Sequence, residues 1–420
     1  MRDSGVIDPA DRLTPYLPED SRGELSEMAV DLLRRADALG AMLRPELRES
    51  LVASLRPMNG YYSNLIEGHN THPLDVERAL RRDYSRDPAK RALQLEGAAH
   101  VEVQELVDAR LKASPPPDPT SAEFLRWVHG EFYARMPPEF RLLTTERARV
   151  EVVPGALRTR HVGIQEHVAP DPHELSAFLA RFQREYAPDQ VKPATRQVVA
   201  AAASHHRLAW IHPFLDGNGR VCRLFTDAYL ARIGVGGHGL WTMSRGLGRN
   251  REAYCRALAN ADAPRQGDVD GRGQRSERAL GAFCRFFIET AIDQVVFMSS
   301  LLEIGGLEER IAGYADRLAA RGQAHPKAKL VLVEVLARGE VERGDAGRST
   351  GLGERAGRAV VSALVSKGLL TSETPKGSLR LAFPAEAAPY YFPKLYPAEI
   401  ELAAEDLTMR DRSRHRGPGR

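Results

Sequence analysis

The segment IHPFLDGNGRVCR, residues 211–223, constrains the backbone more than any other stretch of this chain. Pro213 disfavours the α conformation at the residue before it, so a helix should end at His212. Gly217 and Gly219 allow unusual backbone angles and the close approach of a ligand. A new helix should start at about residue 218, and its free N–H groups would form an anion site. The segment therefore predicts two helices joined by a short anion-binding loop.

Side chains able to carry chemistry gather on this loop. His212 is suited to accept a proton near neutral pH, and Asp216 offers a hard carboxylate oxygen of the kind that holds Mg²⁺ beside phosphates. Arg220 and Arg223 are three residues apart, so they share one face of the second helix, where guanidinium groups suit phosphate oxygens. These residue types predict phosphoryl or nucleotidyl transfer to a hydroxyl group.

HPFLDGNGRVCR resembles the signature of the Fic family, His-x-Phe-x-Asp/Glu-Gly-Asn-Gly-Arg-x-x-Arg, at every defining position. The resemblance implies a mainly α fold, a Fic-type helical core with a β-hairpin flap. It also implies transfer of AMP from ATP to a Ser, Thr or Tyr hydroxyl of a protein, with release of pyrophosphate. In that family His212 would be the base, Asp216 would bind Mg²⁺ and Phe214 would anchor the loop. The implied nucleotide and phosphate contacts are Gly217, Asn218, Gly219, Arg220 and Arg223.

PGALRTRHVGI, residues 154–164, is similar to the family's flap, which pins a target segment over the site by strand addition. The β-branched stretch 148–164, interrupted by Pro-Gly, predicts this hairpin. Arg158, Thr159 and Val162 are then candidates for target docking. An ordinary strand surface is the alternative for these residues.

REAYCRALANAD resembles the family segment that shapes the nucleotide pocket, with Tyr254 and Asn260 as candidates; ordinary helix packing is the alternative. His205 and His206 are adjacent and point to different helix faces, so we expect a capped or solvated face rather than a metal cluster. Cys222, at a variable position of the loop, is expected to be a small buried residue rather than a nucleophile.

SNLIEGHN, residues 63–70, resembles the family's inhibitory motif, Ser/Thr-x-x-x-Glu followed by Gly or Asn. The resemblance implies that Glu67 pairs with Arg223 in place of the γ-phosphate, and that Ser63, one turn earlier, holds the helix against the site. The chain would then belong to the class with an N-terminal inhibitory helix. An ordinary helix end with Gly68 at its C-terminus is the alternative.

The pattern of periodicity and turn signals predicts the order of domains. An N-terminal helical region covers residues 1–110, with helical periodicity over 20–56, a turn at Asn59-Gly60 and an inhibitory helix at 61–68. The catalytic core covers 111–305, a linker helix 306–325, and a winged helix-turn-helix 326–386. A tail, 387–420, ends in the basic run MRDRSRHRGPGR, which we expect to be disordered.

In the winged helix-turn-helix, the recognition helix would span about 354–367, with Arg355, Arg358 and Lys367 as phosphate contacts. Because this helix is rich in alanine and valine, protein docking or dimerisation competes with DNA binding. Two further alternatives are open: a nucleotide-sensing regulator that binds DNA, and a Fic enzyme that uses another nucleotide or removes AMP.

Composition limits the remaining classes. The chain has 43% apolar and 27% charged residues and a net charge of +3, which is typical of a globular protein and gives no reason to expect nucleic-acid binding. Its three cysteines contain no CxxC pair, and no segment is long and apolar enough for a membrane span. We expect a cytoplasmic enzyme with ATP as substrate and Mg²⁺ as cofactor. Its partner would be a hydroxyl-bearing protein or the enzyme itself, with a homodimer left open.

Overall fold

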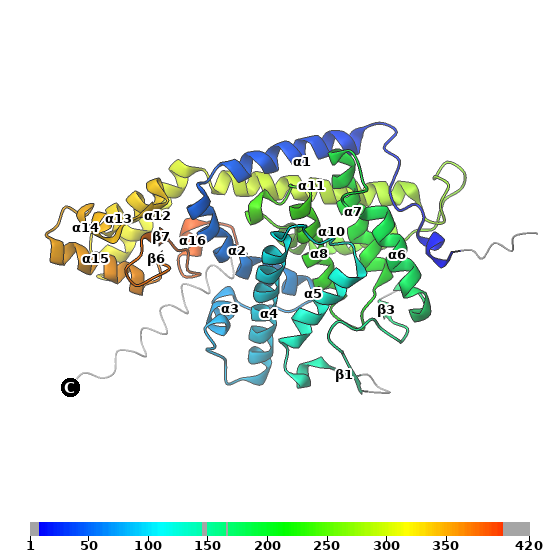
Figure 1. Ribbon diagram of the computed structural model, residues 1–420, viewed down its shortest axis with the longest axis horizontal. Coiled ribbons are helices and arrows are strands. Elements are labelled where there is room, and N and C mark those ends of the chain that lie inside the picture. Colours follow the sequence, from blue (N-terminus) through cyan, green and yellow to red (C-terminus); the bar gives the residue numbers. More distant parts are fainter. Residues whose placement is uncertain (1–7, 145–148, 165–166, 398–420) are drawn as a thin grey trace, which may run out of the picture. The chain divides into compact units, whose positions relative to one another are not determined.

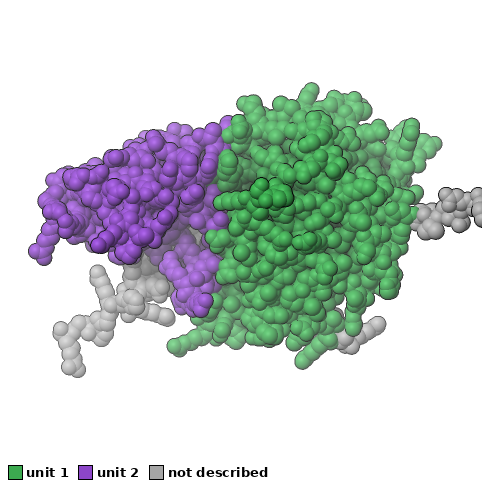
Figure 2. Space-filling model, in the orientation of Figure 1, with its two compact units in different colours: residues 1–37, 59–71, 84–296 green, residues 38–58, 72–83, 297–420 purple. Residues whose placement is uncertain are grey.

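The computed structural model describes residues 8–144, 149–164 and 167–397. Helices dominate these residues and strands are few and short, which confirms the predicted mainly α fold (Figure 1). The chain divides into two compact units, coloured separately in Figure 2. Unit 1 takes residues 1–37, 59–71 and 84–296, and unit 2 takes 38–58, 72–83 and 297–420. Each unit thus draws on three stretches of chain, whereas the predicted domains are contiguous; those domain boundaries stay predictions.

Unit 1 is built around one central helix, α8 (Asn218–Arg232), which packs against four others. Its neighbours are α4 (Pro88–Leu111), α5 (Ala122–Ala134), α7 (Ala194–Ile211) and α9 (Met243–Arg249). The unit also contains η1 (Pro9–Leu13), η2 (Pro138–Arg141), η3 (Pro172–Glu174), α6 (Leu175–Tyr186), η4 (Gly237–Gly239) and α10 (Arg251–Ala261). Three helices contribute residues to both units: α1 (Glu24–Ala41), α2 (Pro45–Ile66) and α11 (Glu277–Leu301). Most residues of α8 are buried, so its first turn is held rigidly.

The predicted turn at Asn59-Gly60 is wrong, because α2 continues through both residues to Ile66, with Pro57 inside it. The helical stretch predicted at 20–56 is instead interrupted at residues 42–44. Gly60 lies where α2 meets α4: a Cβ there would be 3.5 Å from the His100 ring and 3.6 Å from the Gly97 carbonyl oxygen. The glycine therefore permits close helix packing rather than a change of chain direction.

The hairpin predicted at 148–164 is also wrong. Strand β2 (Arg149–Glu151) is antiparallel to the preceding strand β1 (Leu142–Thr144), and Leu143 lies opposite Val150. Strand β3 (Gly163–Ile164) is antiparallel to the following strand β4 (His167–Val168), so β2 and β3 do not pair with each other. The chain between β2 and β3 is fastened to α5 instead of to a partner strand. Gly155 N–H donates to His129 Nδ1 at 2.9 Å, and Arg126 Nε donates to the Gly155 carbonyl oxygen at 2.9 Å.

In unit 2, the segment 326–386 contains the following helices and strands. They are α13 (Ala328–Arg338), β5 (Glu340–Val341), α14 (Arg343–Arg348), α15 (Glu354–Ser366), β6 (Leu370–Thr371) and β7 (Leu379–Leu381). The strands form an antiparallel sheet in the order β5-β7-β6. The unit also holds α3 (Pro73–Leu80), α12 (Ile304–Ala320) and α16 (Ala388–Tyr391). Its identity as a winged helix stays a prediction, and the basic run at 409–420 lies outside the described residues.

Two further expectations concern the chain as a whole. Among the described residues, none of the helices combines the length and apolar character of a membrane span. Cys222, Cys255 and Cys284 are free thiols, and Cys222 is buried as expected.

Candidate active site

The helices on either side of the loop at 212–217 end and begin where the sequence predicts, but the left-handed conformation of His212 was not expected, since a residue before proline usually adopts an extended conformation. Helix α7 ends at Ile211, and His212 adopts left-handed angles, φ 48° and ψ 61°. Gly217 has φ 75°, and α8 begins at Asn218. A non-glycine residue in the left-handed region is uncommon and is held there by its surroundings. The loop therefore presents His212 from a fixed position just before the first turn of α8.

Arg158 supplies much of that restraint. Its Nε donates to the His212 carbonyl oxygen at 2.8 Å and its Nη2 donates to the Pro170 carbonyl oxygen at 2.6 Å. Its backbone N–H donates to the Pro213 carbonyl oxygen at 3.0 Å. Because Arg158 is only 3% exposed, it braces the loop from inside. Thr159 is exposed and Val162 half-buried, and the docking role predicted for these three residues stays a prediction.

Asn218 and Phe214 fix the turn of the loop. The Asn218 Oδ1 accepts from the Phe214 N–H at 2.9 Å, while Asn218 Nδ2 donates to the Phe214 carbonyl oxygen at 2.8 Å. The Phe214 ring is fully buried and stacks on His129, with centroids 4.1 Å apart. Phe214 thus anchors the loop in the core, as expected. The Asn218 side chain uses both of its polar atoms in hydrogen bonds to the loop's own backbone.

Asp216 is oriented by a residue that the sequence analysis missed. The Tyr133 hydroxyl donates to Asp216 Oδ2 at 2.6 Å. The Tyr133 ring occupies the space where a Cβ at Gly217 would lie, 2.7 Å away. Burial, together with the charge of Asp216, raises the pKa of Tyr133, so its hydroxyl keeps the donated proton. Among the residues that the structure describes, Asp216 Oδ1 has no hydrogen-bond partner.

Arg223 is engaged by the segment 63–67, within the same unit. Its Nη2 donates to Glu67 Oε1 at 2.6 Å and to the Ser63 carbonyl oxygen at 3.0 Å, and its Nε donates to Ser63 Oγ at 2.8 Å. Burial raises the pKa of Glu67, but Arg223 and Arg220 outweigh it and lower that pKa, so the carboxylate is charged. A Cβ at Gly219 would collide with Glu67 Oε1, so this glycine makes room for the pair.

Arg220 has partners that no sequence motif pointed to. It pairs with Glu96 of α4, and its Nη2 lies 3.3 Å from His69 Nδ1. His69 Nδ1 is in turn 2.7 Å from Glu96 Oε2. Arg220 is 7% exposed, and burial lowers its pKa to about 10. The sequence signal, visible only in retrospect, is a carboxylate within the small and apolar run of α4, since such a charge needs a partner when buried.

His212 and the two nucleotide-pocket candidates on α10, Tyr254 and Asn260, differ in how far they are buried. Burial lowers the pKa of His212 to about 4, so its ring is neutral at pH 7 and can accept a proton. Tyr254 is buried, with its hydroxyl 2.8 Å from His205 Nε2, while Asn260 is exposed. Their role at a nucleotide stays a prediction.

The solvated face expected for His205 and His206 is wrong, because both rings are buried. His205 Nδ1 lies 2.7 Å from Thr226 Oγ1, and His206 Nε2 lies 3.0 Å from Asp262 Oδ1. The two rings point to different helix faces, as expected, but each face packs against another helix or loop. Within the described part of the chain, no three His, Cys, Asp or Glu side chains gather as a metal site.

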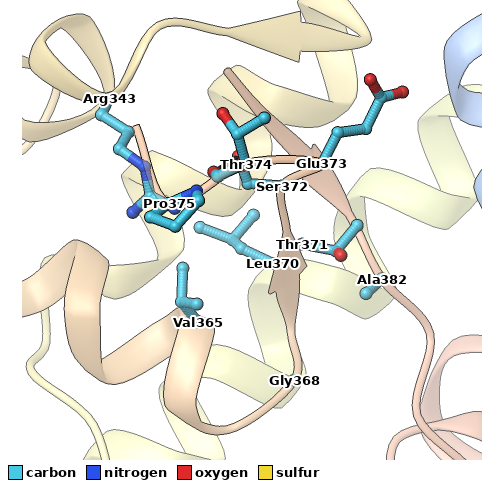
Figure 3. Close-up of a pocket in the computed structure, with 10 residues that line it drawn as sticks. All are labelled: Arg343, Val365, Gly368, Leu370, Thr371, Ser372, Glu373, Thr374, Pro375 and Ala382. Atoms are coloured by element: carbon cyan, nitrogen blue, oxygen red, sulfur yellow. Dashed lines mark hydrogen bonds between the residues drawn. The ribbon is translucent and has the colours of Figure 1, made fainter. Parts of the chain in front are cut away.

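A hollow in unit 2 contains none of the predicted site residues. It lies between the end of α15 and the strand β6, with Val365 and Leu370 on one side and Glu373 on the other (Figure 3). Arg343 borders it, but its Nε donates to the Gly377 carbonyl oxygen at 3.2 Å. The residues predicted to be catalytic or inhibitory, or to bind a nucleotide phosphate or metal, all lie in unit 1 instead.

The sequence of this chain is similar to those of known proteins. Residues 119–230 match the model of the Fic/DOC family. "Protein adenylyltransferase Fic" of Drosophila ananassae is 38% identical over 80 residues, 19% of this chain and 16% of that protein. The protein of the same name from Nematostella vectensis is 28% identical over 178 residues, 41% of this chain and 37% of that protein. The chain thus spans only a minor part of the length of the relatives it matches.

Solved structures of similar chains carry related names. A Fic family protein from Desulfovibrio desulfuricans G20 is 17% identical with a TM-score of 0.46, over 85% of this chain and 97% of that one. Fic-1 of C. elegans is 15% identical with a TM-score of 0.47, over 66% of this chain and 72% of that one. The residues that match the family model lie within unit 1 and include the loop at 212–223.

Proposed function

We propose that this protein is an adenylyltransferase that moves AMP from ATP to a hydroxyl group of a protein. The observation that carries the proposal is the loop at 212–223, which brings a neutral histidine, a carboxylate and two arginines to the first turn of one buried helix. The match to relatives named as protein adenylyltransferases supports AMP as the transferred group.

In this proposal His212 accepts the proton of the target hydroxyl as its oxygen attacks the α-phosphorus of ATP. The new oxygen–phosphorus bond forms while the bond to the β-phosphate oxygen breaks, and pyrophosphate leaves. Positioning and charge stabilisation supply most of the rate in such transfers. The N-terminal N–H groups of α8, with Arg220 and Arg223, would bind the phosphates.

Mg²⁺ fits the residues present. Asp216 would hold it through the oxygen that Tyr133 leaves free, and phosphate oxygens and water would complete the shell, since Mg²⁺ is usually bound by one or two carboxylates. The ion would neutralise charge on the phosphates.

Glu67 would inhibit this reaction. Its carboxylate is bound to Arg223, so the γ-phosphate of ATP would have to displace it or bind elsewhere. In the second case ATP would bind with its α-phosphate misaligned, and misalignment costs much of the rate.

Incubation with ATP labelled at the α-phosphate tests the proposal. The wild type should transfer little label to protein. Glu67→Gly should transfer at least about tenfold more, which corresponds to a decrease of about 1.4 kcal/mol in the activation barrier. Adding Arg223→Ala or His212→Ala to Glu67→Gly should abolish transfer. Labelled UTP run in parallel tests another donor, and release of label from a modified target tests removal of AMP. Absence of transfer from Glu67→Gly with every donor would refute the proposal.

A DNA-binding regulator is the weaker alternative. On α15, Arg358 pairs with Glu354, and on α14, Arg348 pairs with Asp345. These pairs reduce the positive charge that phosphate contacts need. Salt-sensitive, sequence-specific binding of duplex DNA, together with no label transfer, would favour the regulator.

A further inference from the structure

The short stretch after α2, residues 67–70, is attached to the rest of unit 1 at two side chains. Glu67 is bound to Arg223, as described above. Two residues later, His69 Nδ1 lies 2.7 Å from Glu96 Oε2, and the other oxygen of Glu96 pairs with Arg220. The carboxylate of Glu96 therefore holds this stretch and the loop's first arginine at the same time.

The proton between His69 and Glu96 can be assigned. A separation of 2.7 Å requires a hydrogen, because a bare ring nitrogen and a carboxylate oxygen would repel. Nδ1 therefore carries the hydrogen and donates it to Glu96, so it cannot accept from Arg220, 3.3 Å away. Glu96 is 6% exposed whereas the His69 side chain is 45% exposed, so this charge-assisted bond is shielded from water on the Glu96 side only.

The backbone of this stretch is capped on α2 but its side chains need their own contacts: the Gly68 N–H donates to the Leu65 carbonyl oxygen at 3.0 Å and the His69 N–H donates to the Asn64 carbonyl oxygen at 2.9 Å. α2 ends at Ile66, so Glu67 lies just beyond the last helical residue, and helix ends fray. Gly68 follows with φ 89°, the left-handed conformation that a helix C-cap of this kind requires, so the two capping bonds must also break for residues 67–70 to move. Arg251 Nε caps the Ile66 carbonyl oxygen at 2.6 Å, but this contact lies before Glu67.

We propose that His69 is a positioning residue that keeps Glu67 on Arg223 by anchoring residues 67–70 to Glu96. The inference rests on the proposed inhibition by Glu67 and deepens it. For phosphates to reach Arg223, the stretch must swing away, and the hydrogen bond from His69 to Glu96 must break. Glu96 keeps its pair with Arg220 when His69 leaves, so opening the site would leave that arginine in place.

Hydrogen exchange of the amides at 64–71, without any nucleotide, tests the anchor directly. His69→Ala should speed exchange in this stretch about tenfold, in line with the loss of a bond to a charged group. His69→Gln, whose side-chain N–H can still donate to Glu96, should restore slow exchange. His161→Ala, which removes an exposed ring elsewhere in unit 1, is the matched control and should change nothing in the stretch.

Transfer of label gives the second readout. His69→Ala should raise AMP transfer about tenfold, but less than Glu67→Gly does, because Glu67 can still return to Arg223. In the Glu67→Gly background His69→Ala should add nothing, since no carboxylate is left to position. Unchanged exchange in His69→Ala, or an equal rise in both backgrounds, would overturn the anchor. Faster exchange with no transfer by any variant would support the anchor and refute the transferase.

Discussion

His212 is the residue whose protonation should control the rate. Burial lowers its pKa to about 4, so the neutral, proton-accepting ring persists well into the acid range. In Glu67→Gly, kcat/KM for ATP at saturating Mg²⁺ should stay level from pH 8 down to about pH 5 and fall below that, because this parameter reports the free enzyme. An acid limb centred near 6.5, the value of an exposed histidine, would contradict the burial of the ring. Circular dichroism at each pH controls for unfolding.

Tyr133 should act on magnesium through Asp216. Tyr133→Phe keeps the ring against Gly217 but removes the hydrogen bond to the carboxylate, and bonds to charged groups contribute about 1.5–3 kcal/mol. The Mg²⁺ concentration for half-maximal transfer should rise about tenfold, with Mn²⁺ affinity by paramagnetic resonance falling by a similar factor. Tyr229→Phe is the matched control, since it also removes a buried hydroxyl bond, at 2.8 Å to the Tyr186 carbonyl oxygen, near the C-terminal end of α8. Equal Mg²⁺ dependence in the two variants would show that Tyr133 does not orient Asp216.

At the scale of elements, the end of α2 is held by a close contact with α9. A Cβ at Gly248 would lie 2.9 Å from the Tyr62 ring and 3.2 Å from its carbonyl oxygen. Gly248→Ala should therefore lower the free energy of unfolding by about 1–3 kcal/mol, the usual cost of overpacking. Gly281→Ala, inside α11, meets only Pro18 at 3.9 Å and should be neutral or stabilising, because alanine favours helix. Urea unfolding of both variants measures the difference, and equal midpoints would rule out the tight contact.

The elements show what local sequence could and could not predict. The end of α7 and the start of α8 were predictable, because Pro213 and Gly217 act on their own backbone. Gly60 was misread as a turn because its role depends on α4, about 40 residues away in sequence. The hairpin predicted at 148–164 was wrong for the same reason, because the strands in this stretch pair with β1 and β4, which lie outside it.

The contacts of the site residues likewise divide into those that a sequence motif predicted and those that depend on distant segments of the chain. The pairing of Glu67 with Arg223 was expected from a resemblance between motifs, and the structure places the two side chains together. Tyr133 and Glu96 were missed because each lies in a segment without a motif, and His69 because it occupies a position of SNLIEGHN that the motif does not define. All three meet the loop only through tertiary packing. A buried charge or hydroxyl in an apolar helix is a signal that a partner exists, but it does not say which.

At the scale of the whole molecule, the structure buries several neutral histidines in unit 1. Burial lowers the pKa of His100 and of His205 to about 3, and that of His129 to about 4, in addition to His212. In each case the folded pKa lies below the unfolded value near 6.5, so the unfolded chain binds more protons between these limits. The stabilisation is therefore present above about pH 6.5 and is lost as pH falls toward about 4 to 3.

Thermal and urea unfolding of the full chain should show this loss. Each ring that titrates only on unfolding contributes a slope of about 1.4 kcal/mol per pH unit, so stability should fall steeply from pH 6.5 to 4.5. His100→Gln removes one such ring and should reduce the slope by about one proton, whatever it does to stability at pH 7. A free energy of unfolding that stays constant between pH 7 and 5 would mean that these rings are not buried in the neutral form.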